Sequence, residues 1–250
     1  MTDAAVNAIE VPTESEVKDA RNMPAMPSAL AAEVQKPAAF VDSGSVVAFV
    51  SGVTGQNRED VLNSTLLAQM AADKKFSRET QVMDWYAFYQ EVLGKVGWVT
   101  QGFNWEQYTS QKTSFTMDEA VLEIAAAALT GQEEIAVVTA ALEAMKSLKG
   151  GDSRLKIFDH SASSDKAGNF QISVCTETNG AVAMKTMAFY YDAEQQSTTV
   201  LFFNFSSAST TLNQAVNAQT LDSQIYAQVR QAVITKLGDN AKNFVLNLDI

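Results

Sequence analysis

Residues 169–207 constrain the fold most, because they predict three consecutive antiparallel strands. Apolar and polar residues alternate from Asn169 to Thr178, a pattern typical of a strand with one buried face. The dipeptide Asn179–Gly180 follows and favours a tight hairpin turn, because both residue types tolerate a positive φ. The returning run is Ala181–Tyr191, and a third run is Thr198–Ser207. Large apolar residues occupy both faces of the third run, so we expect it inside the sheet and covered on both sides.

A sheet covered on both faces needs helices, and the flanking sequence supplies them. Apolar residues recur at helical spacing in the segments 57–75, 78–93, 116–129, 132–148 and 222–237. A short strand is expected at 45–53, a strand interrupted by two glycines at 96–108, the start of the strand region at 155–158, and a loop or edge strand at 208–217. Residues 41–250 are therefore expected to form one α+β domain, with helices on both faces of an antiparallel sheet.

The first forty residues differ from the rest of the chain. They contain all four prolines and few bulky apolar side chains. This composition favours a flexible or extended arm over residues 1–40. The arm is either a plain tail, a cleavable propeptide or a segment that contacts a neighbouring subunit.

The acidic composition narrows the choice of partner. A net charge of −11 argues against nucleic acid, because phosphate binding requires clustered Lys and Arg. The same charge disfavours anionic lipid at long range and leaves zwitterionic membranes open. The chain has no run of about eighteen apolar residues, and its N-terminus lacks the basic and apolar regions of a secretory signal. We therefore expect a soluble chain without a signal peptide.

Residues suited to catalysis or metal binding are sparse. His160 is the only histidine, and we expect it in a polar loop. Glu133, Glu134 and Glu143 are expected on an exposed helix face. Cys175 is the only cysteine, which excludes an internal disulfide, and its place in a strand favours a buried, inert thiol over a reactive one. We expect no enzymatic activity, no cofactor and no metal site.

Short patches of the sequence resemble a known family. The patches are Gly168–Ile172, Asn179–Met184, Val200–Ser209 and, in the last helix, Leu221–Val233. Together with the order of strands and helices over residues 45–237, they are similar to the Cyt-type cytolysins, the delta-endotoxin class that has volvatoxin-like relatives. The resemblance implies a single three-layer α/β/α domain, in which a central antiparallel sheet lies between two helical hairpins.

The resemblance also implies a function. Members of this family are made as soluble precursors, often in intracellular inclusions, and lose a terminal segment by proteolysis. They then bind lipid directly, move a helical layer aside and place the long strands on or in the membrane. It follows that this chain is expected to be a pore-forming or membrane-perturbing cytolysin, held in the cytoplasm or an inclusion before release and acting as an oligomer. The alternative is a non-lytic, self-assembling structural or inclusion protein with the same fold.

Carried onto this chain, the resemblance makes the hairpins 57–93 and 116–148 the movable covers. Each of the three long strands has the roughly 9–11 residues that cross a hydrocarbon core. The residues expected to interact with the membrane are Phe170, Ile172, Val174, Val182, Met184, Met187, Phe189, Val200, Leu201, Phe202, Phe203 and Phe205. The hairpin 116–148 is rich in alanine, which buries little area per residue, so we expect it to detach at modest cost.

Overall fold

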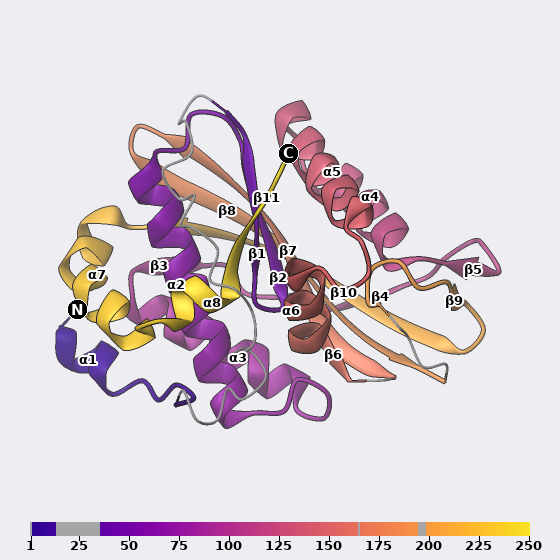
Figure 1. Ribbon diagram of the computed structural model, residues 1–250, viewed down its shortest axis with the longest axis horizontal. Helices are drawn as coiled ribbons and strands as arrows, with labels where there is room; N and C mark the ends of the chain where they lie inside the picture. Colours follow the sequence, from indigo (N-terminus) through magenta and orange to yellow (C-terminus); the bar gives the residue numbers. More distant parts are fainter. Residues whose placement is uncertain (1, 14–35, 165, 195–198) are drawn as a thin grey trace.

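The computed structural model of this 250-residue chain describes residues 2–13, 36–164, 166–194 and 199–250. A large mixed sheet lies between two groups of helices (Figure 1). Helices α2 (Gly55–Lys75), α3 (Val82–Lys95) and α7 (Ser223–Leu237) lie on one side. Helices α4 (Met117–Ala128) and α5 (Gln132–Ser147) lie on the other. The expected α+β class, with a mostly antiparallel central sheet covered by helices, is confirmed.

The sheet has the strand order β11, β1, β2, β7, β8, β10, β3. Their bounds are β11 (Val245–Leu248), β1 (Ala38–Asp42), β2 (Ser45–Phe49), β7 (Ala167–Thr178), β8 (Ala181–Ala193), β10 (Thr210–Leu221) and β3 (Trp98–Thr100). Neighbouring strands on this path are antiparallel except β2 and β7, which run parallel. Two short strands flank the path, since β4 (Glu106–Tyr108) pairs with β10 and β6 (Ser163–Ser164) pairs with β7.

Side-chain caps fix where several helices begin. The Thr54 side chain accepts a hydrogen bond from the backbone N–H of Asn57, so α2 begins before the start of the segment 57–75 that the sequence predicted. Thr116 and Glu119 form a capping box at α4, and Asp222 accepts from two backbone N–H groups at α7. The remaining helices are α1 (Asp3–Asn7), α6 (Ser153–Ala162) and α8 (Asn240–Phe244).

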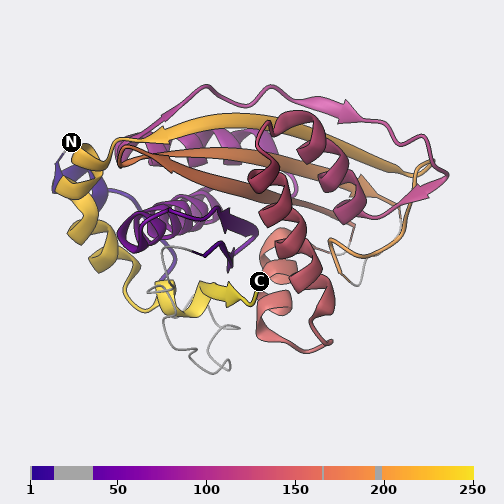
Figure 2. The same cartoon turned by 90° about the horizontal axis from the view of Figure 1, so that it is seen from above.

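The long strands β7 and β8 follow the prediction. They are joined at Asn179 and Gly180, whose φ angles of 53° and 79° are those of the tight turn expected from this dipeptide. β8 also pairs with β10 along its whole length. Figure 2 shows α4 and α5 crossing one face of these strands.

The prediction of a third strand at 198–207 is wrong. Residues 199–204 form turns, and only Phe205–Ser206 is a strand, β9, which pairs with β5 (Ser114–Phe115) in a separate two-stranded sheet. Val200 and Leu201 are fully buried, but as part of a loop in which the Val200 N–H donates to Asp159 Oδ1 at 2.9 Å. An apolar run predicts burial and does not by itself distinguish a strand from a buried loop.

The strand that lies beside β8 is β10, in the segment expected to be a loop or edge strand. Small and polar residues dominate this segment, so its sequence lacks the bulky alternation by which strands are recognised. The segment 155–160 is also different from its prediction, because it belongs to helix α6 and not to a strand and loop.

The N-terminal arm is only partly described. Residues 14–35 lie outside the described residues. α1 contacts α7, and Val6 and Ile9 are buried in the core. β1 begins at Ala38, so the last residues of the segment assigned to the arm belong to the sheet, where no strand was expected.

Candidate functional site

The candidate site is the surface of the three long strands β7, β8 and β10, which have two chemically different faces. The register places Phe170, Phe189 and Gln214 on one face and Asn169, Tyr190 and Asn213 on the other. The first, called here the apolar face, lies against α4 and α5. The second, called the polar face, lies against α2 and α3.

The predicted membrane-interacting residues divide between these faces. Five lie on the apolar face: Phe170, Ile172, Val174, Met187 and Phe189. Two, Val182 and Met184, lie on the polar face. The structure therefore brings together five of these residues on one face of β7 and β8. The group 200–205 lies outside the long strands, although the Phe205 ring meets Tyr191 of β8 edge to face at 5.4 Å.

Packing on the apolar face is aromatic at one end and charged at the other. The rings of Phe170 and Phe189 stack with their centroids 4.8 Å apart, and Phe158 of α6 meets Phe170 edge to face at 6.0 Å. Toward the hairpin turn, Lys185 Nζ lies 3.3 Å from Glu134 Oε2 of α5. The Glu134 side chain is only 15% exposed, so its expected place on an exposed helix face is wrong.

The α4–α5 hairpin covers the apolar face with aliphatic side chains. Its buried residues include the large Val121, Ile124, Val138, Leu142 and Met145 beside the small Ala120, Ala125 and Ala141. Its polar contacts with the rest of the molecule include the Asp118 N–H of α4, which donates to the Leu201 carbonyl oxygen at 3.1 Å. Besides the Lys185 pair, Glu133 accepts hydrogen bonds from the backbone N–H and the hydroxyl of Ser51, and these bonds lower the pKa of the Glu133 carboxyl. This helical layer therefore contacts the strands through aliphatic side chains and through the partly buried Lys185–Glu134 ion pair.

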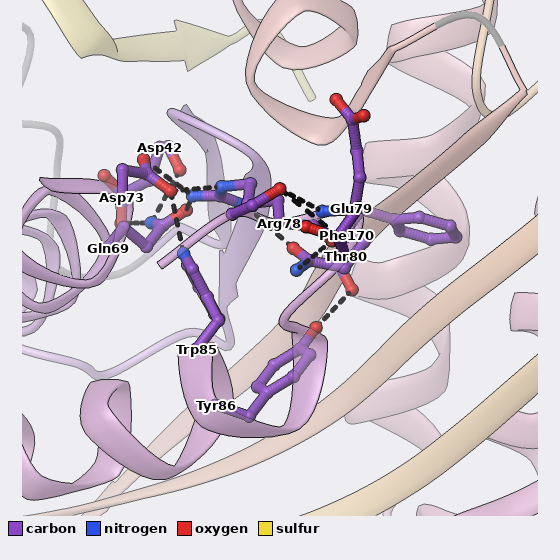
Figure 3. Close-up of polar contacts among 11 residues, drawn as sticks. Asp42, Gln69, Asp73, Arg78, Glu79, Thr80, Trp85, Tyr86 and Phe170 are labelled. Atoms are coloured by element: carbon purple, nitrogen blue, oxygen red, sulfur yellow. Dashed lines mark hydrogen bonds and ion pairs between the residues drawn. The ribbon is translucent and has the colours of Figure 1, made fainter. Parts of the chain in front are cut away.

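The α2–α3 hairpin is held to the polar face by buried hydrogen bonds. The Tyr86 hydroxyl of α3 donates to the backbone carbonyl oxygen of Phe170 at 3.2 Å (Figure 3). Trp98 Nε1 of β3 donates to the Ser64 hydroxyl of α2 at 2.9 Å. Breaking a buried hydrogen bond leaves both groups without a partner and costs their full desolvation free energy. The α2–α3 layer is therefore attached more firmly than the α4–α5 layer.

Arg78 is the centre of a polar cluster between α2, α3 and β7 (Figure 3). Its Nε lies 2.6 Å from Asp73 Oδ1, and its two terminal nitrogens reach Asn169 Oδ1 at 3.1 Å and Gln69 Oε1 at 3.2 Å. Trp85 Nε1 donates to the same Asp73 oxygen at 2.8 Å, while its ring lies under the guanidinium. A single planar cation therefore joins two helices and the central strand.

Asp42, at the end of β1, adjoins this cluster. Its carboxylate accepts from the Thr65 hydroxyl at 2.6 Å and from Gln69 Nε2 at 3.3 Å, and it is fully buried. Burial raises the pKa of Asp42 to about 7, against the opposing effects of the Thr65 hydrogen bond and the Arg78 charge. The group therefore titrates near neutral pH.

Sequence reasoning missed this cluster. The signal that points to it is a lone aspartate at the end of the apolar run Ala38–Val41, since a carboxylate in such a run needs a partner. Its partners come from α2 and from the connection to α3, and nothing local in the sequence indicates that these positions meet.

The other candidate residues offer little chemistry. Cys175 is fully buried, as predicted, and burial raises the pKa of its thiol. His160 is exposed on α6. Among the described residues, no three His, Cys, Asp or Glu side chains gather as a metal site. In the same part of the chain, no helix is both long and apolar enough to cross a bilayer.

Comparisons with known proteins complete the description. No protein-family model and no curated protein matches the sequence. Among solved structures, the fold is similar to a delta-endotoxin at 10% identity and TM-score 0.43, covering 72% of this chain and 81% of that one. It is also similar to the activated Cyt2Ba monomer from Bacillus thuringiensis subsp. israelensis, at 9% identity and TM-score 0.41, covering 72% and 97%. A third structure is the Evf virulence factor, at 13% identity and TM-score 0.34, covering 74% and 69%.

Proposed function

We propose that this protein is a membrane-active, pore-forming or membrane-perturbing cytolysin, which acts without enzymatic turnover. It is made as a precursor and rearranges when it contacts lipid. One observation carries the proposal: β7, β8 and β10 have 12, 13 and 12 residues, enough to cross a hydrocarbon core, and their apolar face is covered by a hairpin whose buried apolar side chains are aliphatic.

The weak attachment rests on packing. At about 25 cal/mol per Å² of apolar area, an alanine gains much less on burial than a leucine. The buried apolar side chains of α4 and α5 are aliphatic and include three alanines, whereas α3 buries Trp85, Tyr86 and Tyr89. The Lys185–Glu134 ion pair of the α4–α5 layer is partly exposed. Such a layer undocks at lower cost than the hydrogen-bonded α2–α3 layer.

In the membrane, lipid replaces the α4–α5 hairpin as the apolar cover of the long strands. When α4 and α5 move away, Phe170, Met187 and their neighbours lose an apolar cover, and the bilayer interior supplies another. Strand edges cannot remain unpaired in lipid, so inserted strands pair with those of other copies, which makes the active form an oligomer. The net charge of −11 favours a zwitterionic target membrane.

The test is dye release from phosphatidylcholine liposomes by the purified full chain, before and after limited proteolysis. We expect release, and we expect proteolysis to increase it if part of the chain restrains the precursor. If neither form releases dye over a wide range of protein concentrations, the lytic function is overturned. Self-assembly then remains as the function of this fold.

A further inference from the structure

A pocket of about 420 Å³ lies where the ends of α1 and α2 meet α3. Its wall includes Ile9 just after α1, Ala71 and Lys75 of α2, and Phe88 and Lys95 of α3. All of the wall residues belong to these three helices and to the turn after α1, so the pocket is separate from the long strands and from the α4–α5 hairpin. Its volume is large enough for a small organic molecule.

The pocket is positively charged, although the chain as a whole is acidic. Three lysines and two glutamates line it, which gives a net charge of +1, whereas the whole chain carries −11. The glutamates are Glu10 and Glu91, and the lysines are Lys74, Lys75 and Lys95. All three lysines lie in the last turn of a helix, where the helix dipole favours a cation, so their positions in the sequence do not indicate a ligand. The placement of their side chains does.

Two of the ammonium groups gather over one aromatic ring. Lys75 Nζ lies 4.0 Å from the centroid of the Phe88 ring, and Lys95 Nζ lies 5.8 Å from it. Lys95 is paired with Glu91 at 2.6 Å. Lys75 forms no ion pair with any residue that the structure describes, and the rings of Phe76 and Phe88 hold its ammonium group instead. Its three N–H donors are therefore available to an anion.

An organic phosphate matches this combination of charge and apolar wall. A phosphomonoester carries a charge of about −1.5 to −2 at neutral pH, so it can engage two lysines where a carboxylate engages one. Beside the lysines lie Ile9, which is 3% exposed, and the Phe88 ring, which Phe76 meets edge to face at 5.9 Å. Flat rings of ligands stack on aromatic side chains of this kind. We infer that the pocket binds a soluble organic phosphate with an aromatic body, the chemical class of a nucleoside monophosphate.

The ligand is coupled to the N-terminal segment, because the pocket wall is shared between that segment and the α2–α3 hairpin. The Ile9 N–H donates to the Val6 carbonyl oxygen at 3.0 Å, and Lys236 Nζ of α7 donates to the Asn7 carbonyl oxygen at 3.1 Å. A ligand stabilises the state that binds it, so a bound phosphate holds the end of α1 against α2 and α3. This site goes beyond the lytic function and does not rest on it.

Calorimetric titration of the full chain at low salt tests the ligand class. The probes are adenosine monophosphate, adenosine, inorganic phosphate and dihexanoylphosphatidic acid. Adenosine monophosphate should bind at least about tenfold more tightly than adenosine or inorganic phosphate, because it alone makes both the charge-assisted and the stacking contacts. If adenosine monophosphate does not bind, or if either fragment binds equally well, the inference is overturned. Tighter binding of dihexanoylphosphatidic acid would assign the pocket to a lipid headgroup and would also overturn it.

Three substitutions test the location of the site. Lys75→Met should weaken the binding of adenosine monophosphate at least about tenfold, because it removes the unpaired ammonium group and keeps an unbranched side chain. Glu91→Gln should tighten binding, because it removes a repelling carboxylate and releases Lys95 from its ion pair. Lys149→Met changes an exposed lysine outside the pocket and is the matched control, which should bind as the natural chain does. Thermal unfolding without ligand shows whether each variant is folded. If Glu91→Gln fails to tighten binding, or if Lys149→Met weakens it as much as Lys75→Met does, the assignment is wrong.

Hydrogen exchange tests the coupling to α1. Backbone amides of residues 3–9 should exchange more slowly when adenosine monophosphate is bound, and at the same ligand concentration Lys75→Met should lose most of this protection. Binding without slower exchange in this segment would overturn the coupling. None of these measurements involves a membrane, so their outcome is independent of the dye-release test of the lytic function.

Discussion

Lys185 Nζ of β8 and Glu134 Oε2 of α5 lie 3.3 Å apart, and their side chains are 29% and 15% exposed. This ion pair ties the start of α5 to the half of β8 next to the hairpin turn. It also places the charge of Lys185 on the face that is otherwise apolar. Its removal therefore tests how the hairpin is held.

Lys185→Met should loosen the hairpin and make the strand more compatible with lipid. The change leaves Glu134 without its partner, so the free energy of unfolding should fall by about 1 kcal/mol. Dye release should become faster because an obstacle to undocking and a charge are both removed. Lys112→Met, which breaks the exposed pair with Glu119, is the matched control and should change neither quantity. Slower release by Lys185→Met would contradict this role.

Joining α5 to the rest of the fold should block activity. Glu133 and Ser51 touch through their side chains, so cysteines at both positions, with Cys175 replaced by Ala, are within reach of a short bis-maleimide. With a reducible disulfide in the linker, the cross-linked protein should unfold at higher temperature and release no dye. Reduction of the linker should restore release.

The control for this experiment is the same double cysteine protein treated with a monofunctional maleimide. If the cross-linked protein permeabilises liposomes as fast as this control does, then α5 belongs to a permanent core and the proposed movement is wrong.

Asp42 should make stability depend on pH between about 4 and 7. Burial raises its pKa from 3.8 to about 7, so over this range the folded protein holds a proton that the unfolded chain releases. The contribution of Asp42 to the free energy of unfolding is therefore greatest below pH 4, and it falls as the pH rises to 7. A shift of about 3 units corresponds to at most about 4 kcal/mol.

Asp42→Asn should remove this dependence and raise the free energy of unfolding at pH 8, as measured by urea denaturation. A smaller slope should remain, because burial also raises the pKa of Asp159 to about 6. Asp84→Asn, an exposed change on α3, should leave the pH profile as it is. A profile unaltered by Asp42→Asn would mean that the Asp42 carboxylate is not the titrating group.

Gly44→Ala should disturb the Arg78 cluster from the turn between β1 and β2. A Cβ at this position would lie 2.5 Å from Arg78 Nη1 and 3.1 Å from the Ser161 carbonyl oxygen. Because the guanidinium is fixed by Asp73 and Asn169, we expect a loss of about 1–2 kcal/mol in the free energy of unfolding. Gly94→Ala in α3, where a Cβ meets nothing within 4 Å, should instead be neutral or stabilising. If Gly44→Ala and Gly94→Ala changed the free energy of unfolding equally, the Arg78 cluster would be shown to rearrange at no cost.

The sequence predicted those parts of the fold whose signal is local. The alternation in β7, the Asn179–Gly180 turn and the apolar spacing of the helices each follow from a short stretch of chain, and the structure confirms them.

The sequence predictions were wrong where residues are buried by parts of the chain that are distant in the sequence. Val200 and Leu201 are as buried as any strand residue, but a loop buries them. β10 is a full-length strand that carries amides where a strand usually has large apolar groups. The Arg78 cluster joins residues 69, 78 and 169, and no local pattern predicts that they meet.

The pairing of β1 with β11 has a consequence for the order in which the chain folds. Asp42 is opposite Val245 and Ala39 is opposite Leu248, so contacts between strands near the two ends of the sequence complete one edge of the sheet. A nascent chain emerges from the ribosome with β1 long before β11 is made, and such distant contacts form late. During synthesis β1 therefore presents an unpaired edge until β11 has been made.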